Sequence, residues 1–155
     1  MPGNLILAVG NAMLGDDAAG PMLARMLEND PAPGWSVIDG GSAPENHVHR
    51  VLAEAPDTVL VVDATDMGLA PGEVRRVDER FIAEQFIMTT HDMPLSFLIE
   101  RIREVVPEVV FLGIQPDIVS FMFPVTPAVQ RAVEDVHARL KKGDALETFE
   151  CLPPA

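Results

Sequence analysis

Three short polar segments of this chain carry the residue types best suited to holding a metal ion. The first follows an apolar run and ends in Asp17, the second begins with Asp63 after another apolar run, and the third contains His91 ahead of a helical pattern. In open α/β sheets, sites form beyond the carboxyl ends of the strands, so these segments are expected on one rim. Two carboxylates and an imidazole suit a divalent first-row metal with open positions for water or substrate.

Each of these residues also has an ordinary structural interpretation. Asp16 and Asp17 are suited to capping a helix and complementing its dipole. Asp63 is suited to a turn that ends a strand. A lone histidine such as His91 is more often a surface or structural residue than a metal ligand. The residue types and their spacing therefore favour a metal site without excluding these alternatives.

The elements that must position these residues follow from the hydrophobic pattern. Strand-like apolar runs alternate with segments of helical periodicity, which is typical of an α/β fold. We predict a three-layer α/β/α arrangement with a mostly parallel central sheet of about five strands. One α/β domain is expected over residues 1–142, and the polar, proline-terminated segment 143–155 is expected to be a flexible tail. The strands are expected near residues 5–9, 35–39, 59–62, 73–77 and 109–114, and the helices near 17–28, 44–55, 80–86, 94–106 and 127–140.

The sequence gives weaker support to other kinds of active site than to the metal site. The pair Gly10-Asn11 lacks the remaining glycines of a dinucleotide-binding motif. No nucleophile elbow follows any expected strand, which argues against a small-molecule α/β hydrolase. The pair Gly40-Gly41 would let a bound peptide approach the backbone closely, although a tight turn is the slightly favoured explanation of two adjacent glycines. Cys151 lies in the expected tail, away from any local base.

The composition limits which binding partners and which cellular compartment are expected. The formal charge is −13, and a surface of that sign repels the phosphates of nucleic acid, so no nucleic-acid partner is expected. No apolar run approaches the roughly 20 residues of a membrane span, so no membrane insertion is expected. The single cysteine excludes an internal disulfide, and the start of the sequence lacks a secretory pattern. These features predict a cytoplasmic protein.

Five segments, taken in order, resemble the nickel–iron hydrogenase maturation protease family: residues 9–17, 37–46, 62–68, 88–95 and 111–119. The resemblance runs from about Leu5 to Val136, and the combination of motifs is highly specific. It implies an endopeptidase that removes the C-terminal extension of a hydrogenase large-subunit precursor after nickel insertion. A nickel-binding maturation chaperone without peptidase activity is the alternative.

The resemblance also assigns roles to residues. By motif, Asp17, Asp63 and His91 are the catalytic residues that face nickel, which the precursor itself is expected to supply. Asp39 matches a position associated with substrate handling, and Gly40 and Gly41 beside it are expected to contact the same peptide. Hydrolysis would be of aspartic type or metal-assisted, and the sequence does not separate these mechanisms.

Overall fold

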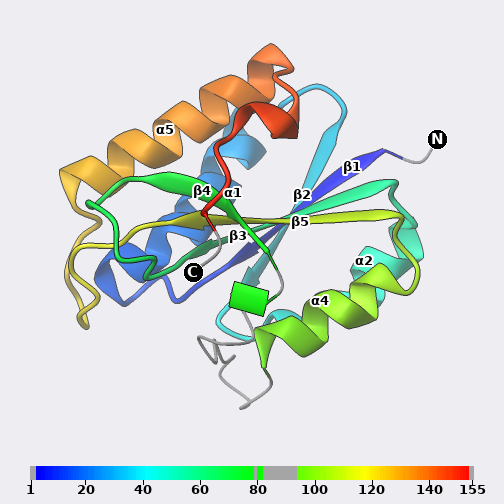
Figure 1. Cartoon of the computed structure of the whole chain (residues 1–155), viewed down its shortest axis with the longest axis horizontal. Coiled ribbons are helices and arrows are strands. Elements are labelled where there is room, and N and C mark those ends of the chain that lie inside the picture. The colour runs from blue at the N-terminus through cyan, green and yellow to red at the C-terminus, as the bar shows by residue number, and fades with distance from the viewer. Residues whose placement is uncertain (1–2, 79, 82–93, 154–155) are drawn as a thin grey trace.

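A computed structural model of the chain describes residues 3–78, 80–81 and 94–153. Within these residues, strands and helices alternate as the apolar periodicity predicts (Figure 1). The strands are β1 (Asn4–Val9), β2 (Trp35–Gly41), β3 (Thr58–Ala64), β4 (Val74–Val77) and β5 (Glu108–Ile114). The α-helices are α1 (Ala19–Asn29), α2 (Val48–Glu54), α4 (Leu95–Arg103) and α5 (Pro127–Lys142), and the 3₁₀ helices are η1 (Gly15–Ala18), η2 (Pro44–His47) and η3 (Leu146–Thr148).

All five strands belong to one sheet in the order β2-β1-β3-β5-β4. β1 pairs in parallel with both β2 and β3, β3 pairs in parallel with β5, and only β4 runs antiparallel, against β5. The predicted mostly parallel sheet is therefore confirmed. After β1 the chain moves to one side to form β2 and then returns to the other side to form β3. The carboxyl ends of β1 and β3 thus lie at a topological switch point, where open α/β sheets bind their ligands.

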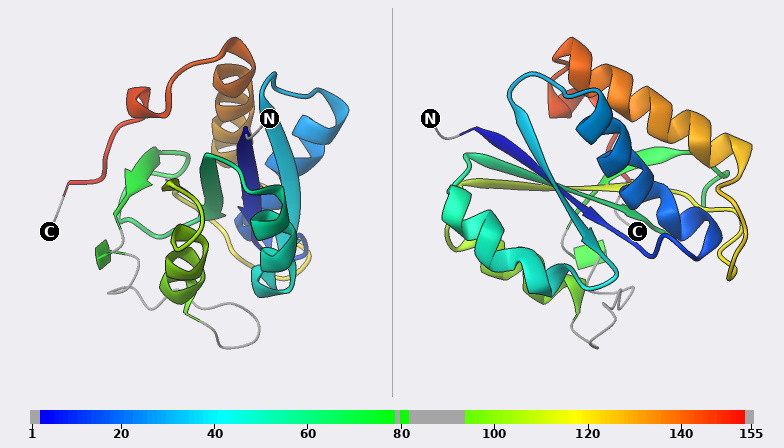
Figure 2. Two further views of the ribbon diagram at one scale, coloured as in Figure 1. Left: turned by 90° about the vertical axis from the view of Figure 1, so that its right-hand side faces the viewer. Right: turned by 180° about the vertical axis from the view of Figure 1, so that it is seen from behind.

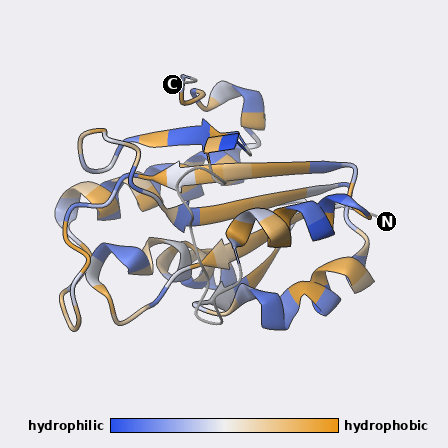
Figure 3. Ribbon diagram, turned by 60° about the horizontal axis from the view of Figure 1, so that its bottom comes forward, coloured by the Kyte–Doolittle hydropathy of each residue, from blue (hydrophilic) through white to orange (hydrophobic). Residues whose placement is uncertain are grey.

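Helices cover both faces of the sheet, as the three-layer prediction requires (Figures 1 and 2). Helices α1 and α5 pack on one face through Leu23, Val133 and Val136, whereas α2 and α4 pack on the other through Val51 and Ile99. The central strands are apolar on both faces, as expected for parallel strands covered on both sides. In Figure 3 these strands are largely orange, while the helices alternate between orange and blue. This rigid apolar body positions the loops at the carboxyl edge.

Several element boundaries differ from the sequence prediction. β3 does not stop at Val62 but continues to Ala64, because Asp63 pairs in register with Gly113 of β5. The helix expected from Asp17 begins instead as η1 and becomes α-helical only at Ala19. Of the helix expected over residues 80–86, the structure describes only residues 80 and 81, which are helical. None of the helices among the described residues is long and apolar enough to cross a membrane.

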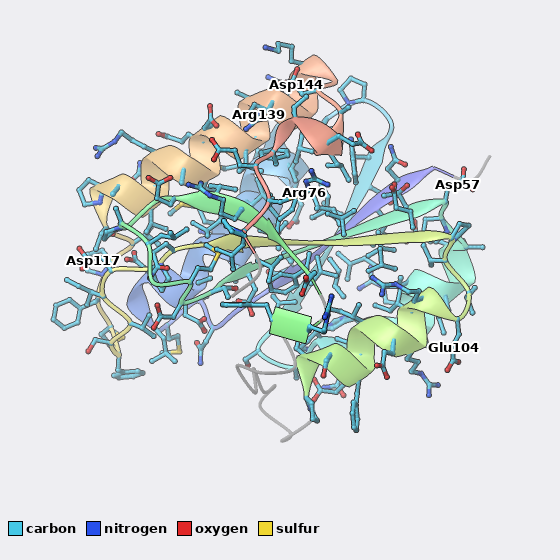
Figure 4. All side chains as sticks on the ribbon, in the orientation of Figure 1. Asp57, Arg76, Glu104, Asp117, Arg139 and Asp144 are labelled. Carbon is cyan, nitrogen blue, oxygen red and sulfur yellow. The ribbon has the colours of Figure 1, made fainter. Side chains whose placement is uncertain are left out.

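The segment after α5 packs against the body, which differs from the expected flexible tail. Leu146 and Phe149 are buried in the α1–α5 layer, and the guanidinium of Arg139 lies 3.7 Å from the centre of the Phe149 ring. Further on, Arg76 of β4 donates its backbone N–H to the Glu150 carbonyl, and the Leu152 N–H donates to the Arg76 carbonyl, at 2.7 and 2.8 Å. The tail extends along the sheet edge because β4 offers unpaired backbone groups there (Figure 4).

Ending the chain after Glu150 is expected to lower stability slightly and to leave peptide processing unchanged. The deletion removes the Leu152 hydrogen bond to Arg76 but keeps Phe149 in the core. One backbone hydrogen bond is worth about 1 kcal/mol, which corresponds to a fall in Tm of roughly 2–4 °C. Thermal unfolding and a processing assay of the shortened chain would measure both effects. A shortened chain that retains its Tm but loses processing would contradict this assignment.

Candidate active site

The loop after β1 is a compact turn that orients Asp17. The Asn11 side chain accepts a hydrogen bond from the Met13 N–H, and the Asn11 carbonyl accepts one from Leu14, at 2.8 and 3.1 Å. The backbone N–H of Asn11 in turn donates to Oδ2 of Asp17 over 2.8 Å. Burial raises the pKa of Asp17, and this hydrogen bond offsets only part of that effect. Asp17 is therefore a half-buried carboxyl group directed back toward the end of β1.

Gly10 lets this turn form. Its φ of 143° lies outside the range that other residues adopt readily. A Cβ atom at this position would lie 2.1 Å from the carbonyl oxygen of Asp17, far inside van der Waals contact. The Gly10 N–H donates to the Gly41 carbonyl over 2.9 Å, which ties the β1 loop to the end of β2. A glycine is needed here for both the backbone conformation and the close approach.

Asp63 is a buried carboxylate at the carboxyl end of β3. It is 6% exposed, and its Oδ1 atom has no hydrogen-bond partner among the residues that the structure describes. Burial raises the pKa of Asp63 well above its usual range, and the negative charge of Asp17 raises it further, while a hydrogen bond from the Ala64 N–H acts in the opposite direction. The two carboxyl groups thus interact electrostatically, as expected for side chains on one rim.

The structure separates the two adjacent acids of the β1 loop. Asp16 is fully buried and accepts hydrogen bonds from the backbone N–H groups of Asp117, Ile118 and Thr126 and from the Thr126 hydroxyl, at 2.7–3.1 Å. Burial alone would raise the pKa of Asp16, but these hydrogen bonds outweigh it and lower the pKa. Neither Asp16 nor Asp17 makes a side-chain cap of η1 or α1. The capping interpretation is therefore wrong for both.

The residues expected to handle the substrate lie on the same rim, at the end of β2. Asp39 is exposed, and its Oδ1 accepts a hydrogen bond from the Gly41 N–H over 3.0 Å. Gly40 is buried, and Gly41 has a left-handed φ of 59° that ends the strand in a turn. The Gly41 carbonyl contacts Gly10, so this turn adjoins the Asp17 loop. The tight-turn interpretation is correct, and the peptide contact stays a prediction.

His91 lies outside the residues that the structure describes, so its place relative to the two carboxylates stays a prediction. Within the described part of the chain, no group of three or more histidine, cysteine, aspartate or glutamate side chains is arranged to hold a metal ion. Of the three expected ligands, the structure therefore brings together Asp17 and Asp63. A pair of carboxylates, one with an unpartnered oxygen, suits a cation or a proton shared between them.

Gln115 supports the site, although its residue type and position predicted no such role. It follows β5 and is buried, and its Oε1 accepts hydrogen bonds from the Met67 and Leu69 N–H groups at 2.7 and 3.3 Å. Its Nε2 donates to Oδ1 of Asp66 over 3.2 Å. Gln115 thereby holds the loop that leaves β3 just after Asp63. The sequence signal that could have indicated this role was a glutamine directly after an apolar run that is long enough to be a buried strand.

Known proteins are similar to this chain in both sequence and fold. A sequence profile described as hydrogenase maturation protease matches residues 21–142. The hydrogenase 3 maturation protease of Escherichia coli K12 is 54% identical over 138 residues, which cover 89% of this chain and 88% of that protein. A crystal structure of a hydrogenase 3 maturation protease superposes with a TM-score of 0.93 at 50% identity, covering 99% of this chain and 98% of the other. A [NiFe] hydrogenase maturation protease of Thermococcus kodakarensis gives 0.78 at 27% identity, covering 90% and 92%. The motifs, the switch-point carboxylates and these similarities agree, and the chain belongs to the hydrogenase maturation protease family.

Proposed function

We propose that this chain is an endopeptidase that removes the C-terminal extension of a nickel–iron hydrogenase large-subunit precursor after nickel insertion. The observation that carries the proposal is the buried Asp63, whose Oδ1 lacks a hydrogen-bond partner among the described residues. An enclosed, unpartnered carboxylate lowers stability, and such groups persist mainly where function requires them. Membership of the family supports peptide-bond hydrolysis as the reaction.

In this proposal, nickel arrives with the precursor and is recognised by Asp17, Asp63 and His91. Carboxylate and imidazole groups suit a divalent first-row metal. The raised pKa values of Asp17 and Asp63 support this assignment. The two carboxyl groups resist being ionised together, and a cation between them would stabilise the doubly ionised state. A precursor that lacks the cation would leave that repulsion in place and bind less well.

The same pKa shifts suggest a source of acid–base chemistry. Without a cation, the Asp63 carboxyl retains a proton to higher pH than an ordinary aspartate does. A positive charge nearby would release that proton and leave Asp63 and Asp17 as carboxylates beside the peptide. Either carboxylate is then suited to accept a proton from an attacking water, which is the aspartic-type version of the reaction. In the metal-assisted version, the same carboxylates orient the water instead.

Asp39, Gly40 and Gly41 are assigned to the peptide in this scheme. They end an edge strand of the sheet next to the Asp17 loop, and Asp39 is exposed. An exposed strand end offers backbone groups to an extended peptide. The carboxylate of Asp39 is placed to orient a basic or amide group of that peptide.

The proposal predicts that processing requires nickel in the precursor. Nickel-loaded large-subunit precursor is expected to be shortened to its mature mass, whereas nickel-free precursor is expected to stay intact, because the carboxylate pair then faces no cation. Incubation of each form with the protein, followed by intact mass measurement, gives the result directly. Trimming of the nickel-free form at the loaded rate would exclude nickel-gated recognition. Binding of the loaded form without trimming would support the chaperone alternative.

A second arm of this experiment tests His91. If His91 is the third ligand, the variant His91→Ala should lose processing of the loaded precursor while keeping its circular dichroism spectrum. His49→Ala is a matched control, because His49 is an exposed histidine on α2 with no assigned role. A folded His91→Ala protein with wild-type activity would remove His91 from the site.

A further inference from the structure

A largely apolar loop projects next to the loop that carries Asp17. Among the described residues, six of the eight large hydrophobic side chains that are exposed gather on two segments, the β1 loop and the loop between β5 and α5. We call this set the apolar patch: Met13, Ile118, Val119, Phe121, Met122 and Phe123. Residues 118–130 carry no charged side chain, in a chain where 23% of residues are charged. Contiguous exposed apolar surface of this kind marks interaction sites.

The two segments of the patch are held together by backbone contacts. The Met122 N–H donates to the Met13 carbonyl over 2.8 Å, and Leu14 forms an antiparallel bridge with Phe121. The Asp16 N–H donates to the Ile118 carbonyl over 2.8 Å. At Gly15, φ is 51°, and a Cβ atom would lie 2.4 Å from that same carbonyl, so the approach requires glycine. Backbone contacts within the fold therefore fix the two segments of the patch relative to each other.

The carboxylate of Asp16 fixes both ends of the projecting loop. It binds the N–H groups of Asp117 and Ile118 where the loop leaves β5 and the Thr126 N–H where the loop enters α5. Figure 4 labels Asp117 at the start of this loop, and Figure 3 shows the loop projecting in orange. Met122, at 71% exposure, has a φ of 67°, a strained conformation for a residue with a side chain. The fold thus holds apolar side chains in water at a cost in free energy.

The patch is continuous with the loop that carries Asp17. The Asp17 N–H donates to the Leu14 carbonyl over 2.9 Å, and Leu14 is the residue that bridges to Phe121. Any occupant of the patch therefore lies next to the loop that carries Asp17. A permanent partner, including a second copy of this chain, would obstruct the site, whereas a substrate binds and leaves.

We infer that the apolar patch is the docking surface for an apolar, uncharged segment of the precursor polypeptide next to the bond that is cut. This inference rests on the proposed function and adds the chemistry of the substrate that the protein selects. Exposed aromatic and methionine side chains suit such a segment, because they supply contact area and adapt to its shape. The acidic remainder of the surface repels acidic segments.

Met122→Gly is the most informative variant. Glycine adopts the left-handed conformation without strain, so the fold is expected to keep or raise its Tm while the patch loses its most exposed side chain. With nickel-loaded precursor, KM is expected to rise about tenfold and kcat to change little, because a binding contact away from the cut bond is lost. Phe121→Ser should act in the same direction. Phe97→Ser is the matched control, because Phe97 on α4 is 62% exposed and Phe121 is 63% exposed.

Three results would overturn the inference. The first is that the wild-type protein cleaves the precursor and both patch variants have the wild-type KM. The second is an equal rise in KM for Phe97→Ser. The third is a change from dimer to monomer in sedimentation with unchanged KM, which would make the patch a self-association surface. Failure of the wild-type protein to cleave loaded precursor would instead refute the proposed function itself.

Discussion

Replacing Asp63 by asparagine is expected to abolish processing and, in the same protein, to raise the free energy of unfolding. Asparagine keeps the shape of the side chain but cannot ionise or bind a cation as a carboxylate does. Loss of an acid–base or metal-facing carboxylate costs about 10²–10⁴-fold in rate. Removal of a buried negative charge that faces Asp17 should stabilise the fold by roughly 1–2 kcal/mol, a rise in Tm of several degrees at pH 8.

The stabilisation should depend on pH with a definite sign. The folded protein raises the pKa of Asp63 above its unfolded value near 3.8, so folding favours the protonated form. Asp63 therefore contributes most to stability below the unfolded pKa, and this contribution is lost as pH rises through the folded pKa. The difference in Tm between Asp63→Asn and wild type should grow over that same interval. Thermal unfolding from pH 4 to 8 measures this difference.

Asp57→Asn is the matched control for this experiment. Asp57 is an exposed aspartate just before β3, at the opposite end of the same strand, and Figure 4 labels it far from the Asp117 loop. The Asp57→Asn variant should process the loaded precursor at the wild-type rate. A variant Asp63→Asn that still processes loaded precursor, or one that unfolds more easily than wild type at pH 8, would show that the carboxylate does not have the proposed role.

Asp16→Ala should give the opposite result, a strongly destabilised protein. The substitution leaves four donors without their acceptor, three backbone N–H groups and the Thr126 hydroxyl, in a fully buried position. A hydrogen bond to a charged group contributes about 1.5–3 kcal/mol, and removing the buried charge relieves its desolvation penalty, so the net loss is expected to be at least about 3–4 kcal/mol. For a chain of this size, that lowers Tm by on the order of 10 °C.

The contribution of Asp16 to stability should also depend on pH, in the opposite direction to that of Asp63. The folded protein lowers the pKa of Asp16 below 3.8, so folding favours the ionised form. Its contribution is fully present above the unfolded pKa and is lost as pH falls through the folded pKa. The Tm difference between wild type and Asp16→Ala should therefore shrink under acid conditions below about pH 4.

Asp17→Asn provides the comparison that separates the two neighbouring acids. It should lose processing yet keep or raise Tm, because burial raises the pKa of Asp17 and its one described hydrogen bond comes from Asn11. Equal destabilisation by Asp16→Ala and Asp17→Asn would contradict the separate roles given to them. Thermal unfolding of both variants beside the processing assay distinguishes these outcomes.

The sequence by itself determined the α/β architecture and the position of the switch-point segments. Apolar runs such as 59–62 are long enough to be buried strands, and their periodicity differs from that of α5, so the order of elements can be predicted from local patterns. The resemblance to a known family placed Asp17 and Asp63 in the site, and the structure brings these two residues within electrostatic reach of each other. Both results depend on short stretches of sequence.

Only the tertiary structure showed what Asp16 does and where the segment after α5 packs. The partners of Asp16 lie 101–110 residues further along the chain, so no local pattern records them. Likewise Gln115 serves a loop nearly 50 residues earlier, and Leu152 pairs with a strand at Arg76. Such contacts arise from the packing of distant segments, and the energy of a buried carboxylate depends on whether those segments supply donors. Adjacent aspartates with the same local sequence signal therefore acquire opposite pKa shifts and separate roles.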